Sequence, residues 1–211
     1  MGEVNAMMDI KDISSQLLKH HQLFTQTKRP FIVGIDGLGG AGKTIYASEI
    51  YHYISQRVPI SVIHLDDHIV QRNKRYNTGH PEWYEYYYLQ WDIERLTKEL
   101  FSRLHNNPKE INLPFYSMKD DSITHKKVDV HPQGITIIEG VFLQRNEWRE
   151  YFDFVIYLTC PFEVRKERVL TRDAYIGDNS EVLDKYKKRY WLAEEYYLKN
   201  INPQKRANLV V

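Results

Sequence analysis

The sequence predicts an α/β protein in which helices cover both faces of a parallel β-sheet. Short apolar segments alternate with longer segments of helical periodicity, which is typical of strands buried in such a sheet. A cluster of glycines joins the first apolar segment to the helix that follows it. Because parallel sheets bind ligands beyond the carboxyl ends of their strands, we expect the functional side chains at that edge.

The N-terminal third predicts helices and strands in alternation. Apolar residues recur at intervals of three to four from Ile10 to Phe24, which indicates an amphipathic helix that ends before Arg29-Pro30. The segments that follow predict a strand, a glycine loop, a helix and a second strand, over residues 31–35, 37–42, 43–57 and 60–65.

The rest of the chain completes the sheet and adds one insertion. Apolar residues at helical spacing predict a helix over 92–104, with Asp92 as its N-cap. Two short segments, 111–116 and 125–130, flank a polar loop and predict a β-hairpin. Further strands are expected at 135–138, 154–159 and 209–211, and further helices directly after Pro161 and over 181–200.

Length and composition favour one domain over 1–211, with an N-terminal helix within 1–28 and the hairpin insertion at about 111–131. Lys and Arg total 29 against 28 Asp and Glu, so the net charge of +1 points to neither nucleic acid nor a membrane as partner. No apolar run approaches the roughly 20 residues of a membrane span. The single cysteine, Cys160, and an N-terminus without a signal pattern favour the cytoplasm.

Residues 37–44 read GLGGAGKT, which matches G-x-x-x-x-G-K-[ST] between a predicted strand and a predicted helix. In this motif, glycines let backbone N–H groups surround an anion at the positive end of the helix dipole. We therefore expect contacts to the phosphates of a nucleotide from Gly37, Gly39, Gly40, Ala41, Gly42, Lys43 and Thr44. The alternative is a glycine-rich turn that binds no ligand.

Further residues decide what kind of P-loop protein this is. No N-K-x-D string is present for guanine recognition. Thr44 and the strand-end carboxylate Glu139 are expected to hold Mg²⁺, directly or through water. Glu139 could instead cap the turn that follows its strand.

Asp66 and Asp67 follow the strand after the P-loop helix, at the expected functional edge. Phosphoryl transfer to a hydroxyl needs a carboxylate that accepts the hydroxyl proton, and we favour Asp66 for this role. The alternative is that the pair caps a helix or turn. In the string HLDDH, His64, Asp66 and His68 would share one strand face and could mimic a metal cluster.

Three arginines, Arg165, Arg168 and Arg172, lie at i, i+3 and i+7 of the helix expected after Pro161. Arginines that close over a nucleotide would neutralise the transferred phosphoryl group and exclude water, which predicts a lid region at about 161–180. Because Lys166 and Glu167 alternate with them, a solvated charged helix is the alternative.

Aromatic residues gather between 76 and 91 and could stack on a flat ring, or could equally form core. The candidates are Tyr76, His80, Trp83, Tyr84 and the run 86–88, with Tyr116 on the hairpin.

With these motifs in place, the chain resembles the uridine kinase-like family of P-loop kinases from about residue 30 onward. The string GIDGLGGAGKT is similar to the family's P-loop, and RKERVLTRD at 165–173 is similar to its lid. The resemblance implies ATP and Mg²⁺ as cofactors and a P-loop nucleoside-kinase-like fold. It also implies catalytic roles for Lys43, Thr44, Asp66, Glu139, Arg168 and Arg172.

The acceptor side differs from uridine kinases. Residues 79–84 keep only His-Pro of the family's D-H-P-x-A-F-D, and the hairpin keeps Pro114 and Tyr116 but lacks the other motif residues. A site built on hydrogen bonds loses orders of magnitude in discrimination when they are removed, so uridine itself is not expected as the acceptor. The Asp66-Asp67 pair, together with Leu158-Thr159, Thr171-Arg172 and Tyr175, also resembles nicotinamide riboside kinases. The candidate substrate-binding residues are Asp67, His80, Tyr84 and Tyr116.

The sequence therefore predicts a kinase that transfers a phosphoryl group to a hydroxyl of a small, nucleoside-like acceptor. Nicotinamide riboside, pantothenate and other alcohols are alternative acceptors. An ATP-binding regulatory protein without acceptor turnover is the alternative from another class. ATP or GTP as donor and the oligomeric state stay open at this stage.

Overall fold

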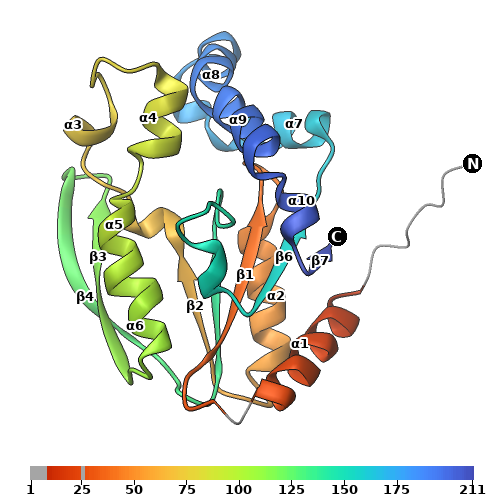
Figure 1. The fold of residues 1–211 in the computed structure, drawn as a ribbon. Helices are drawn as coiled ribbons and strands as arrows, with labels where there is room; N and C mark the ends of the chain where they lie inside the picture. The colour runs from red at the N-terminus through yellow and green to blue at the C-terminus, as the bar shows by residue number, and fades with distance from the viewer. Residues whose placement is uncertain (1–8, 25–26) are drawn as a thin grey trace, which may run out of the picture.

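The computed structural model describes residues 9–24 and 27–211. Its centre is a five-stranded parallel sheet in the order β2-β5-β1-β6-β7, as Figure 1 shows. The bounds of these strands are β1 Phe31–Gly37, β2 Ile60–His64, β5 Ile135–Glu139, β6 Phe154–Leu158 and β7 Leu209–Val210. A separate antiparallel hairpin is formed by β3 Glu110–Ser117 and β4 Ser122–Asp129. The predicted fold class is confirmed.

Alternation along the strands divides the interior into two cores. On β1, Val33 and Ile35 pack against the N-terminal helices α1 Ile10–Phe24 and α2 Lys43–Ile54, whereas Ile32 points into the other core. That second core is larger and aromatic, and it includes the hairpin and the helical segments α5 Ile93–Leu96 and α6 Ser102–His105. A π-helical turn, Thr97–Phe101, joins those two segments.

The remaining helices lie over the carboxyl ends of the strands, at the top of Figure 1. They are α3 Arg72–Arg75, α4 Glu82–Tyr88, α7 Phe162–Arg172, α8 Asn179–Lys185 and α9 Leu192–Ile201; the exception is α10 Pro203–Arg206, which lies lower, beside β7. Helices α8 and α9 form one rod because a π-helical turn, Tyr186–Trp191, connects them. This layer is well placed to enclose a ligand at the functional edge.

Most elements occur where the sequence predicts them. Asp92 accepts a hydrogen bond from the Arg95 N–H, as expected of an N-cap. The helix predicted over 43–57 ends at Ile54, because the N–H groups of Arg57 and Val58 turn back onto the Ile54 carbonyl. The sequence pattern predicted no element for 66–91, because α3 is a single turn without apolar residues and the aromatic residues of α4 hide its helical period.

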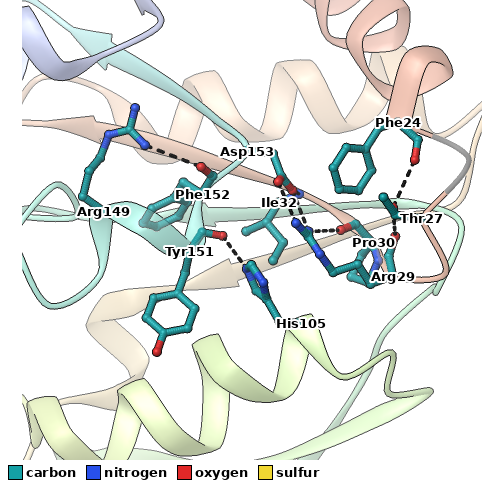
Figure 2. A network of polar contacts seen from close by, with 10 residues as sticks. All are labelled: Phe24, Thr27, Arg29, Pro30, Ile32, His105, Arg149, Tyr151, Phe152 and Asp153. Atoms are coloured by element: carbon teal, nitrogen blue, oxygen red, sulfur yellow. Dashed lines mark hydrogen bonds and ion pairs between the residues drawn. The ribbon is translucent and has the colours of Figure 1, made fainter.

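A polar network ties the strands together at the opposite, amino-terminal edge (Figure 2). Both Arg29 Nη atoms donate to the Asp153 carboxylate at 2.8 Å, and Asp153 Oδ2 also accepts from the Ile32 N–H at 2.8 Å. His105 Nε2 lies 3.0 Å from the Tyr151 carbonyl nearby. These contacts fix the start of β1 against the start of β6.

Candidate active site

The loop between β1 and α2 has the backbone of an anion cradle. Gly40 and Gly42 adopt φ of +76° and +97°, which favours glycine. Gly42 begins α2 without a side-chain cap, so the first N–H groups of the helix have no intrahelical partner. A Cβ on Gly40 would lie 3.0 Å from the Arg165 carbonyl oxygen, so α7 packs directly on the loop. The cradle fits a phosphate group.

Charged side chains from two distant helices hold this loop. The Gly39 N–H donates to Glu194 Oε1 at 2.7 Å, and Arg165 Nη1 donates to the Gly39 carbonyl at 3.0 Å and to Glu194 Oε2 at 2.9 Å. Arg165 and Glu194 are both buried. Arg168 is exposed and donates to the Gly40 carbonyl at 3.1 Å. Of the three arginines, Arg165 therefore braces the P-loop rather than moving freely over it.

Lys43 is a buried ammonium within the P-loop, and its Nζ donates to the Leu38 carbonyl at 3.0 Å. Burial lowers its pKa, and the nearby carboxylates oppose that effect, with Asp66 and Glu139 the strongest. The acidic neighbours keep a cation here favourable.

Thr44 and His64 both contact the same carboxylate oxygen of Glu139. Thr44 Oγ1 donates to Glu139 Oε1 at 3.1 Å, and His64 Nδ1 lies 2.7 Å from the same oxygen. The hydroxyl and the carboxylate are hard oxygen donors that suit Mg²⁺, which keeps most of its water and needs few protein ligands. Among residues 9–24 and 27–211, no group of three His, Cys, Asp or Glu could hold a metal by itself. The triad of His64, Asp66 and His68 is thus not formed, because β2 ends at His64 and a 3-10 turn, Leu65–His68, follows.

Asp66 lies on that turn, beside Lys43 and Glu139. It keeps contact with solvent, yet the cleft walls desolvate its carboxyl and raise its pKa, an effect that Lys43 opposes and Glu139 reinforces. A raised pKa makes a carboxylate a stronger proton acceptor. Asp67 is exposed and does not line the cleft, so the geometry separates the two carboxylates.

A cleft of about 390 Å³ opens between the P-loop and the top helices, which is a size typical of small-molecule sites. Gly39, Asp66 and Arg172 line it together. Its aromatic wall consists of Tyr76, Tyr86, Tyr175, Tyr186 and Tyr190. Arg172 reaches the cleft while its Nε donates to Asp173 Oδ1 at 2.9 Å and an Nη to the Tyr186 hydroxyl at 3.0 Å.

Three other predicted substrate-binding residues lie outside the cleft wall. The exposed ring of His80 stacks on the half-buried ring of Tyr84, with centroids 4.4 Å apart, and neither lines the cleft. Tyr116 donates to Asp121 at 2.9 Å and packs under Arg75, one layer behind the cleft. Of the aromatic candidates, Tyr76 and Tyr86 line the cleft themselves.

Sequence reasoning missed two carboxylates near the P-loop. Asp36, fully buried at the end of β1, accepts from the Tyr197 hydroxyl at 2.6 Å and from Gln144 at 3.0 Å, and burial raises its pKa. The sequence did contain a signal for Asp36, because this charged residue interrupts the apolar run of β1. Glu194 gave none, because nothing in its own helix indicates the contact with Gly39.

Comparisons with known proteins agree with this geometry. The model of the phosphoribulokinase / uridine kinase family matches residues 32–211. A uridine kinase of Lactobacillus helveticus is 28% identical over 194 residues, covering 87% of each chain. That of Halalkalibacterium halodurans is 27% identical over 194 residues, covering 87% of this chain and 86% of its own.

A solved structure is also similar. It is described as a possible uridine kinase from Bacillus stearothermophilus, is 41% identical in sequence and superposes with a TM-score of 0.77 over 96% of this chain and 99% of its own. No helix among the described residues is long and apolar enough to span a membrane.

Proposed function

The chain belongs to the phosphoribulokinase / uridine kinase family of P-loop kinases, and from this premise we propose that it transfers the γ-phosphoryl group of ATP to a hydroxyl of a nucleoside-like small molecule. One observation carries the proposal. The cleft is lined by Gly39 of the phosphate cradle and by Asp66, a carboxylate of raised pKa, and Asp66 interacts electrostatically with Lys43 and with Glu139, which accepts from Thr44.

In the proposed reaction, Asp66 accepts the proton of the acceptor hydroxyl. The hydroxyl oxygen forms a bond to the γ-phosphorus as the bond from that phosphorus to the β–γ bridging oxygen breaks, and its electron pair leaves with ADP. Lys43 and the lid arginines Arg168 and Arg172 offset the negative charge on the transferred group. Bracing by Arg165 keeps the cradle in shape, which lowers the cost of orienting the phosphates.

Mg²⁺, held through Thr44 and Glu139, would neutralise charge on the β and γ phosphates when bound. The hydrogen bond between these two residues already brings their oxygens together. His64 holds the same carboxylate oxygen and orients it.

The acceptor is proposed to be nucleoside-like because the cleft wall offers several flat aromatic faces. Nicotinamide riboside, pantothenate and other alcohols are the alternative acceptors. Asp67, His80, Tyr84 and Tyr116 do not line the cleft, so contact with the acceptor would require the turn at Asp67, the segment from α3 to α4 and the hairpin to move inward. We propose a cytoplasmic enzyme that acts on small molecules.

An ADP-release screen over nucleosides, pyridine ribosides, pantothenate and sugar alcohols tests the proposal. We expect at least one hydroxyl compound to stimulate ADP release well above the ATPase background. ATP binding without stimulation by any of these compounds would instead favour a regulatory ATP-binding protein. Inactivity with uridine and cytidine alone is compatible with the proposal.

A further inference from the structure

One part of the cleft wall is strongly positive. Arg72 and Arg75 on α3 and Lys185 at the end of α8 all line the cleft. Figure 1 places α3 above the hairpin, on the other side of the top edge from α7, which packs on the P-loop. This cationic wall, defined as Arg72, Arg75 and Lys185, is therefore separate from the lid arginines.

The cations of this wall lack carboxylate partners. Among residues 9–24 and 27–211, none of the three forms an ion pair, whereas the neighbouring Arg172 and Arg189 are paired with Asp173 and Glu85. Arg75 is 6% exposed, and its Nε donates to the Val70 carbonyl at 2.7 Å. A buried guanidinium without a directly bonded anion is costly to maintain.

The Tyr76 side chain lies among the same positive charges. Its ring lies 4.8 Å from the Arg75 guanidinium carbon, 4.1 Å from that of Arg189 and 5.8 Å from Lys185 Nζ. Burial alone would raise the pKa of the phenol, yet Arg189, Lys185 and Arg75 together lower it. Three cations around one ring stabilise negative charge at this place.

The acidic residues of the cleft do not cancel this field. Asp173 is paired with Arg172, and Glu194 with Arg165. Asp66 lies next to Lys43, in the part of the cleft assigned to the chemistry. Asp121 on the hairpin accepts from the Arg72 N–H at 2.9 Å and from Tyr116. Asp121 and Asp173 attract Arg75 and Lys185 only from a distance, so among the described residues neither cation that lines the cleft has a directly bonded carboxylate.

We propose that the acceptor is an anionic alcohol, whose carboxylate or phosphate binds Arg75 and Lys185 while its hydroxyl lies at Asp66. The inference rests on the proposed kinase function and narrows its acceptor class. Arg75 presents a planar donor suited to two oxygens of one anion, and Lys185 adds a point charge. A neutral nucleoside would leave both cations without a bonded anion in the cleft.

The test uses pairs of alcohols that differ in charge, with ADP release as the readout. The carboxylate pairs are orotidine with uridine and pantothenate with panthenol. Glycerol 3-phosphate with glycerol forms the phosphate pair. We expect kcat/KM for the anionic member of at least one pair to exceed that of its neutral partner by on the order of tenfold or more, and the pair that responds identifies the anion.

Two variants test the residues. Arg75→Gln and Lys185→Gln should each lower the ratio of anionic to neutral kcat/KM by about tenfold. Lys185 is only partly buried, so its variant is informative even if Arg75→Gln folds poorly. Lys187→Gln, on the exposed side of the same rod, should leave the ratio unchanged.

The possible failures are distinguishable. Preference for the neutral member in every pair would overturn the anionic acceptor and leave the kinase proposal intact. A preference for anions that neither variant reduces would overturn the assignment to Arg75 and Lys185. If neither member of any pair stimulates ADP release, the proposed function fails and this inference fails with it.

Discussion

At the residue scale, the chemistry of the site follows from burial combined with nearby charge. Lys43 is buried among carboxylates, whereas Asp66 lies at the edge of the cleft with its pKa raised. These opposite environments favour a fixed cation next to a proton acceptor, which is the pairing that phosphoryl transfer requires. The same logic applies to His64, whose partner is Glu139.

A pH-dependent stability contribution from His64 is expected in the protein without Mg²⁺ and ATP. The hydrogen bond to Glu139 raises the pKa of His64 above its ordinary 6.5, although burial opposes it. The stabilisation should be complete below about pH 6.5 and lost as the pH rises through the raised value. Urea unfolding of wild type and His64→Asn should therefore differ most at low pH.

The Glu139→Gln background provides the control for this experiment. In that background the pH-dependent effect of His64→Asn on the free energy of unfolding should become much smaller, because only the weaker attraction of Asp67 and Asp66 for His64 remains. A difference between wild type and His64→Asn that stays constant with pH would contradict the assigned ion pair.

Sequence patterns identify residues whose role depends on a local motif. Lys43 and Thr44 follow from the glycine-rich motif, and Asp66 from its position after a strand. Glu194 and Arg75 could not be identified, because each acts across the fold and sits in a segment without a motif. Local spacing likewise placed Arg165 in one row with Arg168 but could not show that a buried carboxylate holds it.

At the element scale, the P-loop depends on close packing against α7. Gly40→Ala should weaken ATP binding by about tenfold, because the new Cβ meets the Arg165 carbonyl oxygen at 3.0 Å and Val169 Cγ1 at 3.1 Å. Isothermal titration calorimetry of ATP binding measures this effect.

Gly79→Ala is the matched control. Gly79 has a similar positive φ of +89°, but a Cβ there would meet no atom within 4 Å. This variant should lose about 1 kcal/mol of stability through its backbone conformation and keep its ATP affinity. Equal loss of ATP affinity in both variants would show that contact with α7 does not matter.

The strands were predicted better than the top helices for a physical reason. Strands buried on both faces, such as β5, are continuous apolar runs, and such runs can be recognised directly in the sequence. Helix α4 carries tyrosines on several faces because aromatic neighbours surround it, so its amphipathic period is hidden. Its position, and therefore the shape of the acceptor wall, comes only from tertiary packing.

At the scale of the whole molecule, the two edges of the sheet have separate roles. The carboxyl edge holds the cleft, and the amino edge holds the network of Arg29 and Asp153 (Figure 2). The chain has 29 Lys and Arg residues against 28 Asp and Glu residues. The molecule therefore has no large net electrostatic field, and selectivity for an anion must arise from charges close to the site.

Asp153→Asn should destabilise the fold by about 1–3 kcal/mol without changing the chemistry. The change weakens the pair of hydrogen bonds that the Asp153 carboxylate accepts from Arg29. Both side chains are less than one-fifth exposed. Chemical denaturation measures the loss, and ADP release by the folded protein should stay at the wild-type value.

Glu110→Gln is the control for that comparison, since it breaks an exposed pair with Lys127. Its cost should be within about 1 kcal/mol. If both variants cost the same, the amino edge does not stabilise the sheet as described.

The central claim, that Asp66 activates the acceptor hydroxyl, is tested most directly by comparing Asp66→Asn with Asp67→Asn. The measurement is kcat for ADP release with the acceptor found in the screen, together with the dissociation constant for ATP. Asp66→Asn should lower kcat by about 10²–10⁴-fold while ATP still binds, and Asp67→Asn should have a much smaller effect. A kcat for Asp66→Asn within a few-fold of wild type would contradict the account.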